Sequence, residues 1–219
     1  MAEVMKKATR DSYGEALVEL GQVNPNIVVF DADLAGATKT GVFKKAFPDR
    51  FFDCGIAECN MIGVAGGLST IGYTVFASSF AMFAAGRAFE QIRNSVAYTN
   101  ANVKLAFTHA GLSVGEDGGS HQSLEDVAIM RTLPNLTIFC PCDAAETRKA
   151  AMAAAEIEGP VYLRLGRSNT DDVTDENTPF VPGKALVLKE GSDAAIFANG
   201  LMVVRALKAA EMLESEGIS

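Results

Sequence analysis

The sequence predicts an α/β protein built on a doubly wound parallel sheet. Short apolar runs rich in β-branched residues alternate along the 219 residues with longer stretches of helical period. That alternation favours parallel strands covered by helices on both faces. A hydrophobic content of 48% also suits a globular protein with a sizeable core. Sheets of this kind bind ligands beyond the carboxyl ends of their strands, so candidate site residues are sought there.

The expected elements alternate from residue 11 to residue 165. The first helix illustrates the pattern, because Ala16, Leu17 and Leu20 fall on one face. Apolar, β-branched runs predict strands at 26–31, 51–54, 74–77, 103–108, 136–140 and 161–165. Apolar residues recurring at helical spacing predict helices at 11–23, 60–71, 81–98, 124–133 and 144–156.

Residues 168–191 interrupt this alternation. They are acidic and polar and contain two prolines, with DDVTDEN as the least core-like run. We expect a first domain at 1–170, a linker at 171–190 and the beginning of a second α/β domain at 191–219. A strand at 193–198 and a helix at 202–216 would start that second domain. One such unit cannot bury a core, so we expect the second domain to be incomplete, or truncated, in this chain.

The composition excludes several classes of protein. The formal net charge is −8, and the chain lacks the clustered cations with which nucleic-acid binders neutralise phosphates. No apolar run approaches the length of a membrane span, and the first residues lack the apolar core of a signal peptide. Cys54, Cys59, Cys140 and Cys142 lack the spacing of structural zinc sites, so we expect reduced, mostly buried thiols. These observations predict a cytoplasmic protein that binds neither nucleic acid nor membrane.

Both histidines of the chain lie in one glycine-rich segment, THAGLSVGEDGGSHQ at 108–122, called the histidine loop below. The loop follows the expected strand at 103–108 and contains four glycines, which let a backbone fold closely around a small anion. His109 and His121 would supply donors near physiological pH. The alternative is a surface loop with solvated histidines.

A second candidate is Glu58, the single carboxylate at the start of an otherwise small and apolar helix. It suits a protonated acid that gives a hydrogen bond, or a carboxylate that only complements the helix dipole; the local sequence leaves both open. By themselves, Phe76, Phe80 and Phe83 at helical spacing favour a structural core over a cofactor platform.

Taken together, these segments resemble the pyrimidine-binding domain of transketolase, in the separately encoded C-terminal section found in many prokaryotes. The string GEDGGSHQ is close to the family's GEDGPTHQ, and GIAE at 55–58 and ATR at 8–10 agree in order and spacing. The resemblance covers residues 8–169. From about residue 179 the chain resembles the beginning of the family's C-terminal domain.

The resemblance implies thiamine diphosphate as cofactor and transfer of a two-carbon ketol unit from a ketose phosphate to an aldose phosphate, as in the pentose phosphate pathway. Glu58 matches the glutamate that hydrogen-bonds N1′ of the aminopyrimidine and promotes its imino tautomer. His121 matches the histidine placed over the reacting carbons. Phe80 and Phe83 match aromatic positions that pack on the pyrimidine, and Asp33 matches an aspartate near the cofactor.

The same resemblance assigns a substrate site. Arg10, His109 and Arg167 match the family's sugar-phosphate clamp, although isolated arginines are otherwise expected as solvated surface charges. Asp117 matches the aspartate that reads a substrate hydroxyl.

Two departures bear on substrate preference, and one bears on assembly. Glu58 is followed by Cys59 and Asn60 where many relatives carry a histidine, and Ala37 replaces a serine that touches the phosphate. The family's GDG motif with a downstream asparagine, which holds magnesium and the diphosphate, does not occur. The resemblance therefore implies no metal on this chain and Mg²⁺ on a partner, an N-terminal section subunit. The expected assembly is α2β2, built around a homodimer of this domain, and the chain alone should be inactive.

Two other interpretations remain. The chain could belong to a deoxyxylulose-phosphate synthase or to the β subunit of a 2-oxo-acid dehydrogenase, although GEDGGSHQ and the phosphate clamp point away from the dehydrogenase. It could also be a non-catalytic subunit with an assembly or regulatory role. The joint presence of Glu58 and His121 counts against that second interpretation.

Overall fold

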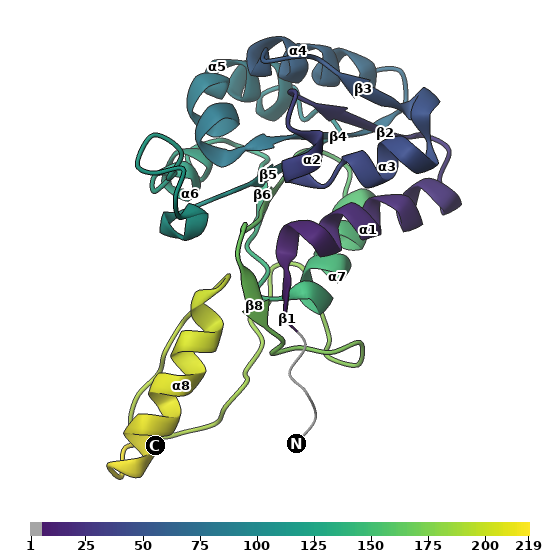
Figure 1. Ribbon diagram of the computed structural model, residues 1–219. Coiled ribbons are helices and arrows are strands. Elements are labelled where there is room, and N and C mark those ends of the chain that lie inside the picture. Colours follow the sequence, from purple (N-terminus) through teal and green to yellow (C-terminus); the bar gives the residue numbers. More distant parts are fainter. Residues whose placement is uncertain (1–5) are drawn as a thin grey trace.

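The computed structural model describes residues 6–219, and its centre is a six-stranded, wholly parallel sheet (Figure 1). The strand order is β3-β2-β4-β5-β7-β6. The longest strand, β4, is central and buried along its whole length. The strands are β2 (Ile27–Asp31), β3 (Phe51–Asp53), β4 (Thr74–Phe80), β5 (Val103–Thr108), β6 (Thr137–Phe139) and β7 (Val161–Arg164).

Helices cover both faces of the sheet, which confirms the doubly wound α/β class. Alternate residues of β2 enter different cores: Val28 and Phe30 pack into one, Ile27 and Val29 into the other. The first core lies under α4 (Glu58–Ser69), α5 (Phe89–Gln91) and the wide π-helical turns η2 (Met82–Arg87) and η3 (Ile92–Ala97). The second lies under α1 (Thr9–Val23), α3 (Gly41–Ala46) and α7 (Ala144–Glu156).

Most expected elements are confirmed, with boundary shifts where local signals are weak. The bounds of β5 and α7 are those expected, whereas β4 runs three residues beyond 77 and ends at Phe80. The helix expected at 124–133 is only α6 (Asp126–Met130), because residues 124–125 bend before it and residues 131–133 turn after it. The short helices α2 (Ala35–Thr38), α3, η1 (Pro48–Arg50) and η4 (Leu112–Val114) were not predicted, since each is too short to establish a period.

An antiparallel pair that periodicity did not predict joins β1 (Lys6–Ala8) to β8 (Asn169–Asp171). Just beyond it, the buried Asp143 holds the chain at Val173 and Thr174, whose backbone N–H groups donate to Oδ2 at 2.8 and 2.5 Å. The other oxygen of Asp143 caps α7 by accepting from the N–H of Glu146 at 2.8 Å. One carboxylate thus fixes a helix start and the segment that follows β8.

The strand expected at 193–198 is wrong. Residues 172–201 contain no strand, and Phe197 is 91% exposed. A strand needs a neighbour for its backbone groups, and none is present beside this segment among residues 6–219. The expected helix does form, as α8 (Met202–Ser215), which extends away from the sheet (Figure 1).

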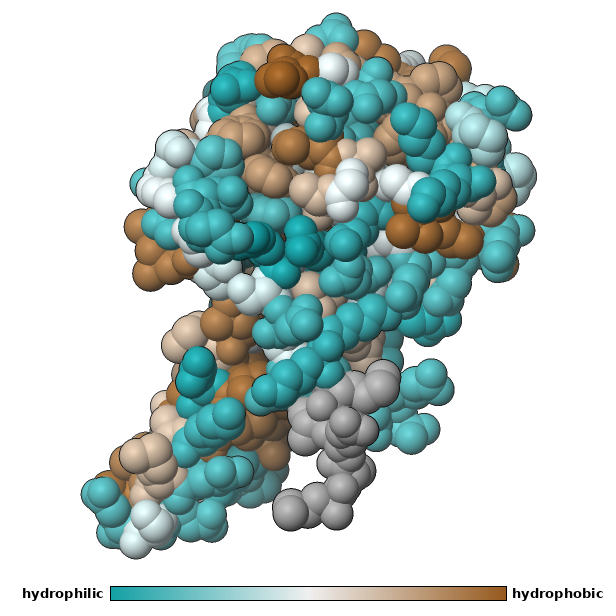
Figure 2. All heavy atoms as spheres, viewed as in Figure 1, coloured by the Kyte–Doolittle hydropathy of each residue, from teal (hydrophilic) through white to brown (hydrophobic). Residues whose placement is uncertain are grey.

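Residues 181–219, here called the C-terminal arm, therefore expose much apolar surface, and Figure 2 shows hydrophobic side chains among its surface residues. The arm touches the sheet domain where the N–H of Gly200 donates to the carbonyl of Cys140 at 2.9 Å. Within residues 6–219, no helix has both the length and the apolar character needed to cross a membrane.

Asp143→Ala is expected to lower the free energy of unfolding by about 2–4 kcal/mol, because it removes a helix cap and leaves buried N–H donors unpaired. Urea unfolding of the chain measures this. Asp175→Ala is the matched control, since the carboxylate of Asp175 bonds only an exposed turn. Equal losses for the two variants would contradict the role given to Asp143.

Candidate active site

The sequence-predicted residues gather at the carboxyl edge of the sheet. Asp33 follows β2, Glu58 follows β3, Phe80 ends β4, His109 follows β5 and Arg167 follows β7. Since all these strands are parallel, their carboxyl ends meet at one edge. The topology alone therefore brings together residues that lie more than a hundred positions apart.

Aromatic rings form the centre of this edge. Phe80 stacks on Phe83, with centroids 5.6 Å apart, and on His109, with centroids 3.8 Å apart. The ring of His121 meets Phe83 edge-on at 5.0 Å. Phe76, by contrast, is wholly buried in the second core. The core interpretation is thus right for Phe76, while Phe80 and Phe83 lie at the edge beside both histidines.

Glu58 opens α4, and its side chain is only 1% exposed. Its partner is Arg87, which periodicity and motif did not predict: Nη1 donates to Oε2 at 2.8 Å. The guanidinium of Arg87 also lies over the ring of Phe83, with Cζ 5.7 Å from the centroid. No described residue hydrogen-bonds the second carboxylate oxygen of Glu58. The site therefore couples the buried acid to the aromatic rings through one planar cation.

His109 lies near the start of the histidine loop. It is 2% exposed, and its backbone is left-handed, with φ of 58°. Its Nε2 lies 3.3 Å from Nη1 of Arg10, and its Nδ1 lies 2.9 Å from Oγ1 of Thr108. A guanidinium only donates, so Nε2 accepts and the ring proton sits on Nδ1. Burial, with Arg10 and Arg167 adding to it, lowers the pKa of His109 to about 4. His109 is therefore neutral near pH 7, and the solvated-loop interpretation is wrong for it.

The two candidate arginines are held by protein groups. Arg10 donates from Nη1 to the carbonyl of Ala37 at 3.0 Å, while its Nε is buried without a partner among the described residues. Arg10 thus lies between the carbonyl of Ala37 and the ring of His109. Arg167 donates to the carbonyl of Val114 and to the carboxylate of Glu116 inside the histidine loop. That ion pair lowers the pKa of Glu116 to about 2.

The aspartates at this edge divide into buried and exposed. Asp31 is buried and accepts from Oγ1 of Thr38 and of Thr40 and from the N–H of Leu34, so it shapes the turn after β2. Burial nevertheless raises the pKa of Asp31 to about 6. Asp33 is exposed, with φ of 62°, and its N–H donates to Asp53 at 3.0 Å. Asp117 is exposed in the histidine loop, and its charge acts on His109.

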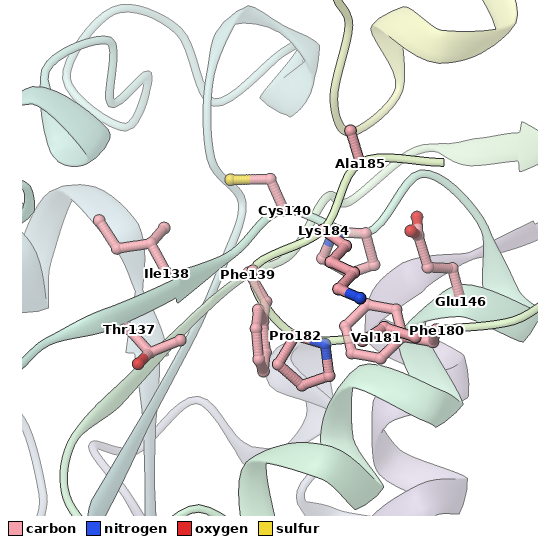
Figure 3. Close-up of a pocket in the computed structure, with 12 residues that line it drawn as sticks. Thr137, Ile138, Phe139, Cys140, Glu146, Phe180, Val181, Pro182, Lys184 and Ala185 are labelled. Atoms are coloured by element: carbon pink, nitrogen blue, oxygen red, sulfur yellow. The ribbon is translucent and has the colours of Figure 1, made fainter. Parts of the chain in front are cut away.

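Features elsewhere in the structure are separate from this edge. A cavity of about 330 Å³ lies between β6 and residues 180–185 (Figure 3), and none of the predicted site residues lines it. The four cysteines are free. Among the residues that the structure describes, no group of three or more His, Cys, Asp or Glu side chains is arranged to hold a metal ion.

Comparison with known families identifies the architecture. The sequence model for the transketolase pyrimidine-binding domain matches residues 5–172, and that for the transketolase C-terminal domain matches residues 183–219. The chain belongs to the transketolase family.

Similar proteins include separately encoded transketolase subunits. A protein of Methanocaldococcus jannaschii named as a transketolase C-terminal section is 52% identical over 97% of this chain and 68% of its own length. The 6-deoxy-6-sulfo-D-fructose transketolase subunit of Clostridium sp. is 44% identical over 95% of this chain and 65% of its own length. A solved structure described as a split gene transketolase, inactive β4 tetramer, is 60% identical, with a TM-score of 0.88. The match spans 97% of this chain and 69% of the chain in that structure. The chain spans only about a third, 34%, of Homo sapiens transketolase.

Replacing Arg87 tests the ion pair of this transketolase-family site. Arg87→Met should lower the free energy of unfolding by about 1–2 kcal/mol, because it leaves a buried carboxylate unpaired. The loss falls below that of a fully buried pair, since the guanidinium is 54% exposed. Arg93→Met, a change at an exposed position of the neighbouring helical turn, is the control and should stay within about 0.5 kcal/mol of wild type in urea unfolding. A neutral Arg87→Met would contradict the pairing.

The pKa of His109 predicts a pH dependence of stability. The unfolded chain binds a proton at this ring near pH 6.5, whereas the folded chain binds it near pH 4. Between these values the unfolded chain binds a proton that the folded chain excludes, so the free energy of unfolding falls as the pH falls, by up to about 1.4 kcal/mol per pH unit.

Asp31 acts with the opposite sign in the same window, because its pKa is raised to about 6. Wild type must therefore be compared with His109→Gln, which retains Asp31 and keeps an acceptor for Arg10. Urea unfolding from pH 4 to 6.5 should show a steeper rise of stability with pH in wild type. Parallel curves would contradict a lowered pKa of His109.

Proposed function

We propose that this chain is the C-terminal section of a split transketolase. It would transfer a two-carbon ketol unit from a ketose phosphate to an aldose phosphate, using thiamine diphosphate in an active site completed by an N-terminal section. The observation that carries the proposal is the grouping of Glu58, the Phe80–Phe83 stack, both histidines and two arginines at one sheet edge.

The cofactor's pyrimidine fits the residues present. The guanidinium of Arg87 shows what the space between Phe83 and Glu58 accepts. It is a flat, conjugated group that lies over the ring of Phe83 and donates to Glu58. An aminopyrimidine has the same flatness, but its N1′ accepts a hydrogen bond, so Glu58 would meet it as a protonated carboxyl group. Phe80 and Phe83 would pack on its ring. The protonated carboxyl group of Glu58 would donate to N1′, and we expect it to exchange Arg87 for the pyrimidine as its partner.

Bound thiamine diphosphate supplies the stabilised carbanion on which ketol transfer depends. The chain's own residues bind, orient and move protons around it. The ring of His121, fixed edge-on against Phe83, would donate to the developing alkoxide of the substrate. The exposed carboxylate of Asp117 would accept a hydrogen bond from a substrate hydroxyl. Asp33 would line the same edge on the β2 side.

The anionic end of the substrate would bind at Arg10, His109 and Arg167. Arg10 has an unpartnered buried Nε, and Arg167 can exchange the exposed Glu116 for a substrate oxyanion. His109 is neutral here, so it serves as a hydrogen-bonding ring and not as a cation. An anionic sugar as substrate is supported by two similar subunits, one named for 6-deoxy-6-sulfo-D-fructose and the other for apulose 4-phosphate.

A partner chain would supply what this chain lacks. The sequence offers no GDG motif, so Mg²⁺ and the diphosphate end of the cofactor are assigned to an N-terminal section. We propose an α2β2 assembly with a homodimer of this domain at its centre and cofactor sites between unlike chains. Domain limits of 1–170 and 191–219, joined by the linker 171–190, complete this proposal. The β4 tetramer of the similar split transketolase is described as inactive, which supports the need for a partner.

Reconstitution with an N-terminal section subunit tests the proposal. Ketol transfer from xylulose 5-phosphate to ribose 5-phosphate should be absent from the purified chain and appear on mixing. Glu58→Ala should lower kcat of the mixture about 10²–10⁴-fold. Glu176→Ala, at an exposed acidic position, is the control and should leave kcat unchanged.

Three outcomes would overturn the proposal. Full activity of the purified chain would remove the need for a partner. Unchanged turnover of the Glu58→Ala mixture would favour a non-catalytic subunit. Condensation of pyruvate in place of ketol transfer would indicate a deoxyxylulose-phosphate synthase reaction.

A further inference from the structure

We propose that Arg164 and Asp126, supported by Tyr162, are positioning residues that set the histidine loop in its working conformation. They touch none of the groups assigned to cofactor or substrate. Instead they connect the two ends of the loop to the last residue of β7. The inference rests on the proposed function for its effect on catalysis, while its effect on loop mobility stands without it.

The loop closes on itself through main-chain bonds. Ala110 forms a parallel bridge with Ser123, and the N–H of Gly111 donates to the carbonyl of Ser123 at 2.9 Å. The N–H of Ala110 also donates to the carbonyl of Leu165 at 3.3 Å. Residues 112–122 therefore project from a narrow neck that lies against the end of β7.

One buried carboxylate lies just beyond the neck. Asp126, the first residue of α6, accepts from Nε of Arg164 at 2.7 Å and from Nη2 at 3.2 Å. Tyr162 adds a third donor, its hydroxyl lying 2.6 Å from Oδ2. The side chains of Asp126 and Tyr162 are wholly buried. Because both oxygens of Asp126 accept from Arg164, the pair fixes the orientation of Asp126 as well as its distance from β7. The end of the loop that leads into α6 is therefore oriented by β7.

The same guanidinium lies against the proximal end. Gly111 has φ of 78°, and a Cβ added to it would meet Nη2 of Arg164 at 3.3 Å. Arg164 thus touches the loop at Gly111 and, through Asp126, at the start of α6. Since His109 lies two residues before Gly111 and His121 lies two before Ser123, a shift of this guanidinium would move both rings relative to Phe80.

A second set of contacts, made by Arg167 and Ser168, holds the middle of the histidine loop. Within the loop, Arg167 holds Val114 and Glu116, and Oγ of Ser168 donates to the carbonyl of Ser113 at 2.9 Å. Those contacts fix the middle of the loop, but they include Arg167, which would bind the substrate anion under the proposed function. Asp126 is wholly buried, and neither it nor Arg164 is assigned to substrate, so this pair can keep the loop oriented when Arg167 changes partner.

The experiment uses the reconstituted complex and a double variant that separates stability from position. Arg164→Met leaves Asp126 buried without its cation and should lower both stability and kcat. In a Tyr162→Phe background, which removes the buried hydroxyl that would otherwise lose its acceptor, Arg164→Met with Asp126→Leu replaces the pair by apolar side chains of similar size, which is often neutral for stability. We expect the double variant to regain stability but to keep a kcat about 10–100-fold below wild type, the range expected when catalytic groups are misplaced by about 1 Å.

Two further readouts isolate the loop. Affinity for thiamine diphosphate should change less than about threefold, because its pyrimidine contacts come from Glu58, Phe80 and Phe83, none of which lies in the loop. Hydrogen exchange of peptides from 112–122 should accelerate in both variants. Arg148→Met is the matched control: it removes a similar two-pronged ion pair with Glu19, on the face formed by α1 and α7, and should leave kcat and loop exchange unchanged.

The outcomes are distinct. Recovery of kcat together with stability in the double variant, or loop exchange equal to that of Arg148→Met, would overturn the positioning role. If the wild-type complex shows no ketol transfer, the proposed function fails. Exchange at 112–122 would then still decide whether Arg164 orders the loop.

Discussion

The parallel pairing of β4 with β5 determines where the active-site groups lie. Its register places Phe80 beside Thr108, so the next residue, His109, stacks directly on the Phe80 ring. Pairing of β2 with β3 and β4 brings the turn after Asp31 and the start of α4 to the same edge. A slip of one residue would turn Phe80 to the other face of the sheet and separate it from Phe83 and both histidines. The chemistry proposed for this chain therefore depends on backbone register before it depends on any side chain.

The periodic parts of the fold were predictable, because burial on both faces of a parallel sheet leaves a strong sequence signal. The bounds of β5 and α7 show this. The strand expected at 193–198 failed for a different reason: IFA has strand propensity, but a strand forms only beside a neighbour. Glu58 could be found from its isolation in an apolar helix. Arg87, its partner, lies 29 positions away across a π-helical turn, and no local pattern connects the two. Only the general expectation that a buried carboxylate pairs with a cation could have suggested that Glu58 has an arginine or lysine partner.

The site carries its own compensating charges in a chain of net charge −8. Arg87 pairs with Glu58, Arg164 with Asp126 and Arg167 with Glu116. These pairs differ in what they can do. Asp126 is wholly buried, whereas Glu116 is 77% exposed and the guanidinium of Arg87 is 54% exposed. Under the proposed function, the Arg87 and Arg167 pairs would exchange partners when pyrimidine and substrate bind. Under the proposed function, ion pairs that stabilise the chain alone would open to accept ligand in an active site shared with a partner chain.

A structure of the complex between this chain and an N-terminal section subunit, with thiamine diphosphate bound, tests this account most directly. The account predicts the pyrimidine on Phe83 with N1′ hydrogen-bonded to Glu58, Arg87 displaced from that carboxylate, and the diphosphate and Mg²⁺ held by the partner. A cofactor held wholly by one chain, or a pyrimidine bound elsewhere while Arg87 remains on Glu58, would contradict it.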